Sequence, residues 1–181
     1  MIPTPAIASV PILRPNDLKA LAPHRRSPED YLVDKPASAF AEALRVLKTS
    51  LTHARVDRRA KVIAVTSAVP EEGKTTMALC LTRISAMSGQ RVVVVDCDLR
   101  RHSLSSNAAK DARVGLLDVL SGDRAWRESV VQDRETAADI IPALATRFTP
   151  QDVFDSQAMQ RLVEELRGAY DLVILDSAPV L

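Results

Sequence analysis

Three apolar runs in this chain each end on a polar or acidic residue, and these runs set the expected architecture. They lie at residues 61–66, 91–96 and 171–176, and the second contains four consecutive valines. Short runs of apolar, largely β-branched residues are typical of strands that are buried on both faces of a parallel sheet. The pattern therefore predicts three strands at the centre of such a sheet.

Helical patterns lie between and around these strands. An apolar stripe at spacings of four, three and four residues predicts one helix, and it consists of Phe40, Leu44, Leu47 and Leu51. Further helices are expected at residues 76–88, 116–120 and 156–167, and a short strand is expected at 139–142. The alternation of strands with helices indicates an α/β fold with a mostly parallel, doubly wound sheet.

The two ends of the chain differ from this middle part. Residues 1–36 contain seven of the eleven prolines, which predicts an extended arm or linker and not a helix. Residues 37–181 form the expected nucleotide-binding domain. Because a doubly wound sheet normally continues past the last acid-tipped strand, we expect this domain to be truncated at its C-terminus. Residues 101–113 are expected to form a polar loop.

A phosphate-binding loop follows the first strand. Residues 68–75 read A-x-x-x-x-G-K-T, with alanine where the first glycine usually stands, and they lie between a predicted strand and a predicted helix. In such a loop, backbone N–H groups and the helix N-terminus bind phosphate, the lysine bridges the β- and γ-phosphates, and the threonine hydroxyl binds Mg²⁺. The predicted ATP-binding residues are Ala68, Val69, Pro70, Glu71, Glu72, Gly73, Lys74, Thr75 and Thr76.

Acidic residues end the other two strands. Asp96 and Asp98 follow the valine run, and Asp176 follows the third run in the pattern of a Walker B motif. In parallel sheets ligands bind beyond the carboxyl ends of the strands, so these acids are expected beside the phosphate loop. A single acid at a strand end is more often a turn residue or a helix cap, but G-K-T, D-x-D and D-x-x-P at three strand tips of one chain indicate a P-loop NTPase fold.

The combined motifs resemble the bacterial tyrosine kinase family, whose kinase domains belong to polysaccharide co-polymerases. The family has a loop of the type S-x-x-P-x-E-G-K-[ST], and residues 67–75 match it. It has a second motif, h-h-h-D-x-D-x-R, and residues 93–100 match that one. Its Walker B motif, h-h-h-D-x-x-P, is matched by residues 173–179. Arg101 is followed by His102, where the family commonly has proline.

The resemblance implies an ATP-dependent protein-tyrosine autokinase domain that regulates capsular or exopolysaccharide biosynthesis and export. It implies ATP and Mg²⁺ as cofactors and Lys74, Asp96 and Asp98 as the catalytic residues, with Asp96 as the base for a tyrosine hydroxyl. Thr75, Asp98 and Asp176 are then the expected Mg²⁺ ligands. Tyr31 and Tyr170 are the chain's two tyrosines, so the C-terminal tyrosine cluster of such kinases has no counterpart here.

The resemblance also implies partners and a location. A membrane co-polymerase or adaptor, separate or fused, is the expected partner, and the cytoplasmic side of the bacterial plasma membrane is the expected location. A family helix motif for ring assembly, E-x-x-R-x-x-R, is nearly matched by Glu42, Arg45 and Lys48. Ordinary surface pairing at spacing i, i+3 explains these residues as well as a homo-oligomeric ring does.

Composition excludes several other classes of protein. The chain has 46% hydrophobic residues and a formal net charge of +1, which argues against global disorder and against general nucleic-acid binding. Cys80 and Cys97 have no metal-ligand spacing, and the three histidines have none either. Cys97 lies between two acids, which predicts a raised pKa and an unreactive thiol.

Two other functions remain open on the sequence. A partitioning-type P-loop ATPase is one, although such proteins carry a signature lysine where this chain has Val69. A nucleotide-sensing regulatory module without catalytic activity, part of the same export machinery, is the other.

Overall fold

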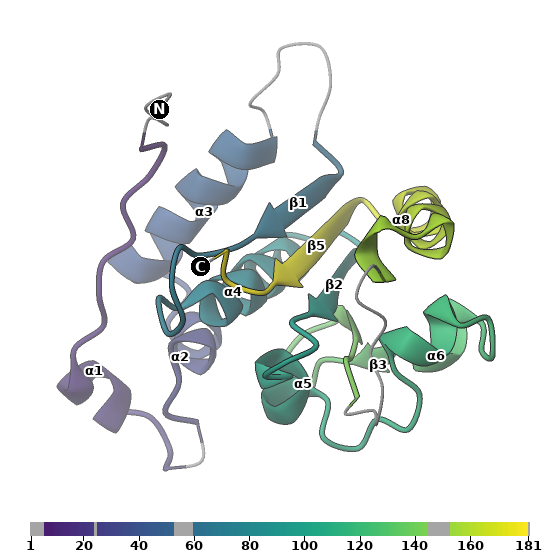
Figure 1. Ribbon diagram of the computed structural model, residues 1–181. Coiled ribbons are helices and arrows are strands. Elements are labelled where there is room, and N and C mark those ends of the chain that lie inside the picture. The colour runs from purple at the N-terminus through teal and green to yellow at the C-terminus, as the bar shows by residue number, and fades with distance from the viewer. Residues whose placement is uncertain (1–5, 24, 53–59, 145–152, 181) are drawn as a thin grey trace. The chain divides into compact units, whose positions relative to one another are not determined.

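The computed structural model describes residues 6–23, 25–52, 60–144 and 153–180 (Figure 1). The chain divides into two compact units, Met1–Ala60 and Lys61–Leu181. The sequence-based boundary at residues 36 and 37 stays a prediction.

A five-stranded sheet forms the centre of the C-terminal unit. Its strands are β1 (Val62–Val65), β2 (Val92–Cys97), β3 (Val131–Gln132), β4 (Asp139–Ile141) and β5 (Leu172–Ser177). They lie in the order β1-β5-β2-β4-β3, and every neighbouring pair is parallel except β3 with β4. The three apolar runs of the sequence are therefore three adjacent parallel strands, and the predicted α/β fold with a mostly parallel sheet is confirmed. The first run is β1, which lies at the edge of the sheet and has no buried residue, so its prediction as a buried central strand is wrong.

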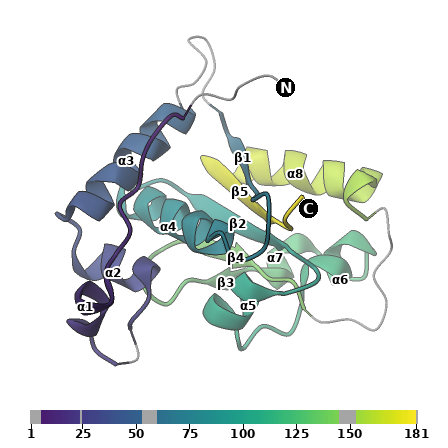
Figure 2. The same cartoon turned by 60° about the vertical axis from the view of Figure 1, so that its left-hand side comes forward.

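Helices cover both faces of this sheet (Figure 2). They are α4 (Lys74–Met87), α5 (Ser103–Ala108), α6 (Leu116–Leu120), α7 (Trp126–Ser129) and α8 (Gln157–Ala169), with a 3-10 turn at Val153–Asp155. Val93, Val95 and Cys97 of β2 lie in the core that α6, α7 and α8 complete. Because side chains alternate along a strand, Asp96 points to the opposite face, which α4 and α5 cover.

Two segments of this unit differ from the sequence-based expectation. Helix α4 begins at Lys74, two residues earlier than predicted, because Gly73 adopts φ +82° and ends the loop directly before the helix. Residues 101–113, expected as a polar loop, contain α5, which buries Leu104 completely. Helix α8 lies close to its expected place, and the Ser156 hydroxyl caps it by accepting from the Met159 amide at 3.2 Å.

The N-terminal unit contains α1 (Pro15–Lys19), α2 (Pro28–Asp34) and α3 (Ala39–Thr52). The prediction that residues 1–36 are an extended arm is therefore wrong for α1 and α2; residues 1–5 and 24 lie outside the described part. Proline occupies the first helical position of both helices, where its missing N–H has no partner to lose and its fixed φ suits the helix. Helix α3 carries the predicted stripe, of which Phe40 and Leu44 are buried.

Candidate nucleotide-binding site

The loop from Ser67 to Gly73 joins β1 to α4 at the carboxyl end of the sheet. Its conformation needs two residues with positive φ, Glu71 at +68° and Gly73 at +82°. The Glu72 carboxylate accepts hydrogen bonds from the Ala68 amide at 2.9 Å and the Val69 amide at 3.1 Å. The first two amides of the predicted phosphate loop are thus bonded to the loop's own glutamate, and the loop residues 68–73 are exposed.

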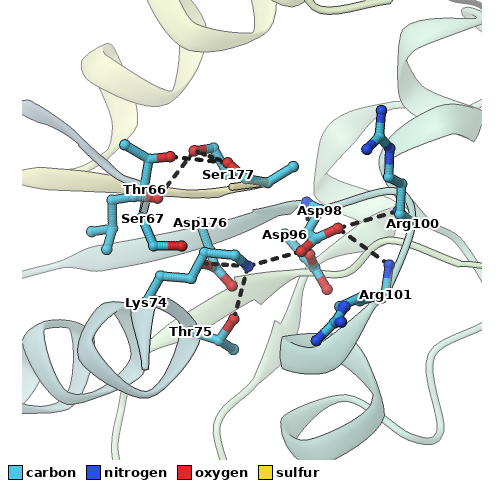
Figure 3. Close-up of polar contacts among 12 residues, drawn as sticks. Thr66, Ser67, Lys74, Thr75, Asp96, Asp98, Arg100, Arg101, Asp176 and Ser177 are labelled. Carbon is cyan, nitrogen blue, oxygen red and sulfur yellow. Dashed lines mark hydrogen bonds and ion pairs between the residues drawn. The ribbon is translucent and has the colours of Figure 1, made fainter. Parts of the chain in front are cut away.

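Lys74 lies at the centre of the acidic cluster that the sequence predicted (Figure 3). Its ammonium group donates to Asp98 Oδ2 at 2.8 Å and to Thr75 Oγ1 at 3.3 Å, and it lies 3.8 Å from Asp176 Oδ1. The side chains of Lys74 and Asp98 are 8% and 1% exposed, so this is a nearly buried ion pair. Thr76 follows as a half-buried residue in the first turn of α4.

The Asp98 carboxylate follows directly after β2 and is held in its charged form. Burial favours its neutral form, but the hydrogen bond from Lys74 and the amides of Arg101 and Arg100 outweigh this, and the pKa of Asp98 is lowered. The two amides donate to Asp98 Oδ1 at 3.2 and 3.3 Å. The aspartate therefore holds the start of the next turn while it pairs with the P-loop lysine.

Asp176 presents the opposite situation. It lies in β5 beside Asp96 of β2 in the strand register, it is fully buried, and neither of its oxygens has a hydrogen-bond partner in the described structure. Burial raises the pKa of Asp176 to about 6, and the charges of Asp96 and Asp98 add to the rise, while the Thr75 hydroxyl and the Lys74 charge oppose it. A buried carboxylate beside a threonine hydroxyl and a phosphate-binding loop fits a divalent cation.

Mg²⁺ would be held here by Thr75 and Asp176, with Asp98 as a further ligand once Lys74 has moved. Within residues 6–23, 25–52, 60–144 and 153–180, no group of three or more His, Cys, Asp and Glu side chains is arranged to hold a metal. Mg²⁺ is commonly bound by one or two carboxylates together with substrate phosphates and water.

Asp96 is fully buried, and protein groups satisfy most of its acceptor positions. Oδ1 accepts from the Asp98 amide at 3.1 Å, and Oδ2 accepts from the amide and the hydroxyl of Ser105 at 3.0 and 2.6 Å. Burial raises the pKa of Asp96, and the Ser105 and Asp98 hydrogen bonds oppose the rise. The candidate base is thus a rigidly held carboxylate.

The structure brings the predicted catalytic and metal-binding residues together from the ends of two strands, β2 and β5, and the start of helix α4. Sequence reasoning missed Ser105, because it lies in a segment read as a polar loop. The expectation of a raised pKa for the Cys97 thiol is confirmed, but burial is the main cause and the charges of Asp96 and Asp176 are smaller ones.

The predicted assembly residues lie in the N-terminal unit. The Arg45 guanidinium donates to Glu42 Oε2 at 3.1 Å and to the Pro36 carbonyl at 2.6 Å. Burial and the charge of Arg45 lower the pKa of Lys48. Surface pairing at i, i+3 is therefore present within one copy of the chain, and the ring interface remains a prediction.

The two tyrosines differ in their surroundings. Tyr170 is buried, and its hydroxyl donates to Asp139 Oδ2 at 2.7 Å. Burial and the hydrogen bond to Asp139 raise the pKa of Tyr170, so its hydroxyl is a poor candidate for phosphorylation. Tyr31 lies in α2, with its ring edge-on to Phe40 at a centroid distance of 6.2 Å. His24 and His53 lie outside the described residues.

Comparison with protein families places this chain in a known group. The model of the AAA domain family matches residues 60–181. The tyrosine-protein kinase YwqD of Bacillus subtilis is 33% identical over 147 residues, which cover 81% of this chain and 62% of YwqD. The succinoglycan biosynthesis transport protein ExoP of Rhizobium meliloti is 33% identical over 150 residues, which cover 81% of this chain and 19% of ExoP. The chain thus spans less than two thirds of either relative.

Solved structures agree with these relatives. The kinase domain of Escherichia coli tyrosine kinase ETK matches with a TM-score of 0.85 at 28% identity, covering 97% of this chain and 69% of that one. The BceF tyrosine kinase domain matches with a TM-score of 0.78 at 30% identity, covering 98% and 72%. The septum site-determining protein MinD of Pyrococcus horikoshii, complexed with Mg-ADP, has a TM-score of 0.57 at 25% identity, covering 67% and 50%.

Among the described residues, no helix is long and apolar enough to span a bilayer.

Proposed function

Because this chain belongs to the AAA-domain P-loop family, in the group of the bacterial tyrosine kinases, we propose that it is an ATP-dependent protein-tyrosine kinase domain. The observation that carries the proposal is the convergence of Asp98 and Asp176 within 4 Å of the Lys74 ammonium group. It matches the parts that P-loop phosphoryl transfer needs: a phosphate-binding lysine, an acid at each neighbouring strand tip and a threonine at the helix start.

The nucleotide is ATP with Mg²⁺ in this proposal. The MinD neighbour in complex with Mg-ADP supports a magnesium-bound nucleotide for this fold. Backbone amides from Ala68 to Thr76 and the start of α4 bind the phosphates, as helix N-termini favour anions. When bound, Mg²⁺ neutralises charge on the β- and γ-phosphates; Thr75, Asp98 and Asp176 hold it.

The chain's residues act mainly by positioning and by charge. Lys74 leaves Asp98 and binds the β- and γ-phosphates, where it stabilises the charge that develops during transfer. Asp96 accepts the proton of the tyrosine hydroxyl, directly or through one water molecule. The tyrosine oxygen forms a bond to the γ-phosphorus, the bond from that phosphorus to the β-phosphate oxygen breaks, and ADP leaves.

The biological setting is also part of the proposal. The name of ExoP, a succinoglycan biosynthesis transport protein, supports a role in exopolysaccharide biosynthesis and export. The partner is then a membrane co-polymerase or adaptor at the inner face of the plasma membrane. A homo-oligomeric ring would use the charged side of α3 (Glu42, Arg45 and Lys48), and the kinase domain would begin near residue 37.

Radiolabel transfer from [γ-³²P]ATP tests the proposed activity. The chain is incubated with Mg²⁺ and a synthetic glutamate–tyrosine copolymer, beside Lys74→Ala and the control Lys110→Ala, which changes an exposed lysine of the same unit. We expect label on tyrosine for the parent and for Lys110→Ala, and none for Lys74→Ala.

The other outcomes separate the alternatives. ATP binding without hydrolysis or transfer favours the nucleotide-sensing module. Phosphate release without tyrosine labelling favours the partitioning-type ATPase. If the parent and Lys74→Ala bind ATP equally, the nucleotide site itself is wrongly assigned.

A further inference from the structure

Ser105 connects Asp96, the candidate base, to the segment that follows β4. It lies in α5, it is 5% exposed, and its hydroxyl lies between Asp96 Oδ2 at 2.6 Å and the Ala143 amide at 2.8 Å. Asp96 belongs to β2, and Ala143 follows β4 by two residues. One buried hydroxyl therefore ties the Asp96 carboxylate to the segment after β4, which lies 38 residues beyond Ser105 in the sequence.

The direction of these hydrogen bonds is fixed by chemistry. A backbone N–H can only donate, so the Ser105 oxygen accepts from Ala143 and its single proton must go to Asp96. The Ser105 amide donates to the same carboxylate oxygen at 3.0 Å. Ser105 thus acts on Asp96 Oδ2 with two donors, and the Ala143 amide keeps its hydroxyl from turning away.

Counting acceptor positions shows which oxygen remains available. Each carboxylate oxygen has about two lone-pair positions. Ser105 uses both positions on Oδ2, while the Asp98 amide uses one on Oδ1 at 3.1 Å. Oδ1 therefore keeps one acceptor position that none of these three hydrogen bonds fills.

We infer that Ser105 is the positioning residue of this site, which locks Asp96 so that Oδ1 is the oxygen that accepts the tyrosine proton. The inference rests on the proposed kinase function and adds a residue to it. Without the Ser105 hydroxyl, the carboxylate loses a donor on Oδ2 and can rotate. Oδ1 is then no longer held in the one orientation in which it accepts the tyrosine proton.

A backbone detail supports a defined geometry at this point of the chain. His102 adopts φ +47° directly before α5, and its amide donates to the Asp98 carbonyl at 3.0 Å. Proline can adopt neither this φ nor this donor role. The residue that departs from the family pattern therefore suits the turn that brings Ser105 to Asp96.

The test separates positioning from folding by measuring turnover and nucleotide binding in the same variants. Ser105→Ala removes the hydroxyl, Ser105→Thr retains it, and Ser105→Cys keeps the size but donates weakly. Ser106→Ala is the matched control, since Ser106 is the next residue of α5 and is exposed. Tyrosine phosphorylation of the copolymer gives kcat and KM, and calorimetry gives the Kd of Mg-ATP.

We expect Ser105→Ala to lower kcat about 10- to 100-fold, as a small displacement of a reacting group does. The KM and the Kd of Mg-ATP should stay within about two-fold of the parent, since Ser105 touches the base and not the phosphate loop. Ser105→Thr should restore most of kcat, and Ser106→Ala should equal the parent. Should alanine unfold the chain, Ser105→Cys gives the same comparison.

Two failures are distinguishable. If the parent labels tyrosine and Ser105→Ala or Ser105→Cys labels it equally well, Ser105 does not position the base and this inference falls alone. A loss of kcat that comes with an equal loss of Mg-ATP affinity also overturns it, because the role is then structural. A parent that binds Mg-ATP but transfers no phosphate overturns the proposed kinase function, and the inference with it.

Discussion

Replacing Asp176 by asparagine is expected to stabilise the ligand-free chain at neutral pH, although it removes a candidate metal ligand. The carboxylate is fully buried and neither oxygen has a hydrogen-bond partner. Burial raises its pKa from 3.8 to about 6. A shift of that size corresponds to roughly 3 kcal/mol of unfavourable free energy for the charged group in the folded state.

The sign follows from where the proton is held more tightly. Because the folded pKa lies above the unfolded one, the folded state binds the Asp176 proton more strongly between pH 4 and 6. Raising the pH through this window therefore lowers the stability of the parent, while Asp176→Asn has no charge to lose. We expect the stability advantage of the variant to grow by about 2 kcal/mol from pH 4.5 to pH 7.5.

Urea unfolding in EDTA at these two pH values measures the difference. Asp171→Asn is the matched control at the other end of the same strand, where the hydrogen bond from the Arg91 side chain lowers the pKa of the exposed Asp171. The stability that Asp171 contributes is present at neutral pH and is lost as the pH falls, so its substitution should have the opposite sign. If Asp176→Asn is no more stable than the parent at pH 7.5, the conclusion that burial disfavours the charged form of Asp176 is wrong.

Three further predictions concern ATP binding, the phosphorylated tyrosines and assembly. Lys74→Ala should weaken Mg-ATP binding in calorimetry roughly 10- to 100-fold, since charge-assisted hydrogen bonds to the phosphates are lost; equal affinity contradicts the P-loop assignment. Tyr170→Phe should leave tyrosine labelling unchanged, because the Tyr170 hydroxyl is buried and bonded, and a phosphopeptide that contains phosphorylated Tyr170 would refute this. The chain should be monomeric by light scattering at micromolar concentration, because exposed ion pairs contribute only about 0–1 kcal/mol each. A ring that survives a triple alanine substitution on α3 would overturn the interface assigned to Glu42, Arg45 and Lys48.

The sequence predicts the acidic cluster well because its parts are local patterns with one geometric consequence. The runs that end at Asp96 and Asp176 are recognisable as buried strands, and parallel strands bring their carboxyl ends to one edge. The G-K-T sequence then marks the start of a helix at that edge. No long-range contact had to be guessed to place Lys74 beside these acids.

The contacts that escaped prediction depend on a helix with a weak signal. Residues 103–108 read SLSSNA, in which serine and asparagine favour turns as much as helices, and a single leucine supplies the buried face. Ser105 could be assigned to Asp96 only from the three-dimensional arrangement. The prolines of residues 1–36 caused the opposite error. They predicted an extended arm, but Pro15 and Pro28 occupy the first positions of two helices.

In the proposed kinase, the Lys74–Asp98 pair would make ATP binding dependent on the metal. Lys74 must leave Asp98 to reach a phosphate, and breaking a buried ion pair by removing one partner costs about 3–5 kcal/mol. A divalent cation beside Asp98 and Asp176 would replace the lost positive charge and could bind the oxygens of Asp176, which have no hydrogen-bond partner. If nucleotide bound without metal, the negative charges of Asp98 and Asp176 would lack a compensating positive charge. If metal bound without nucleotide, it would compete with Lys74 for the Asp98 carboxylate. The arrangement of Lys74 therefore favours the metal–nucleotide complex over either ligand alone.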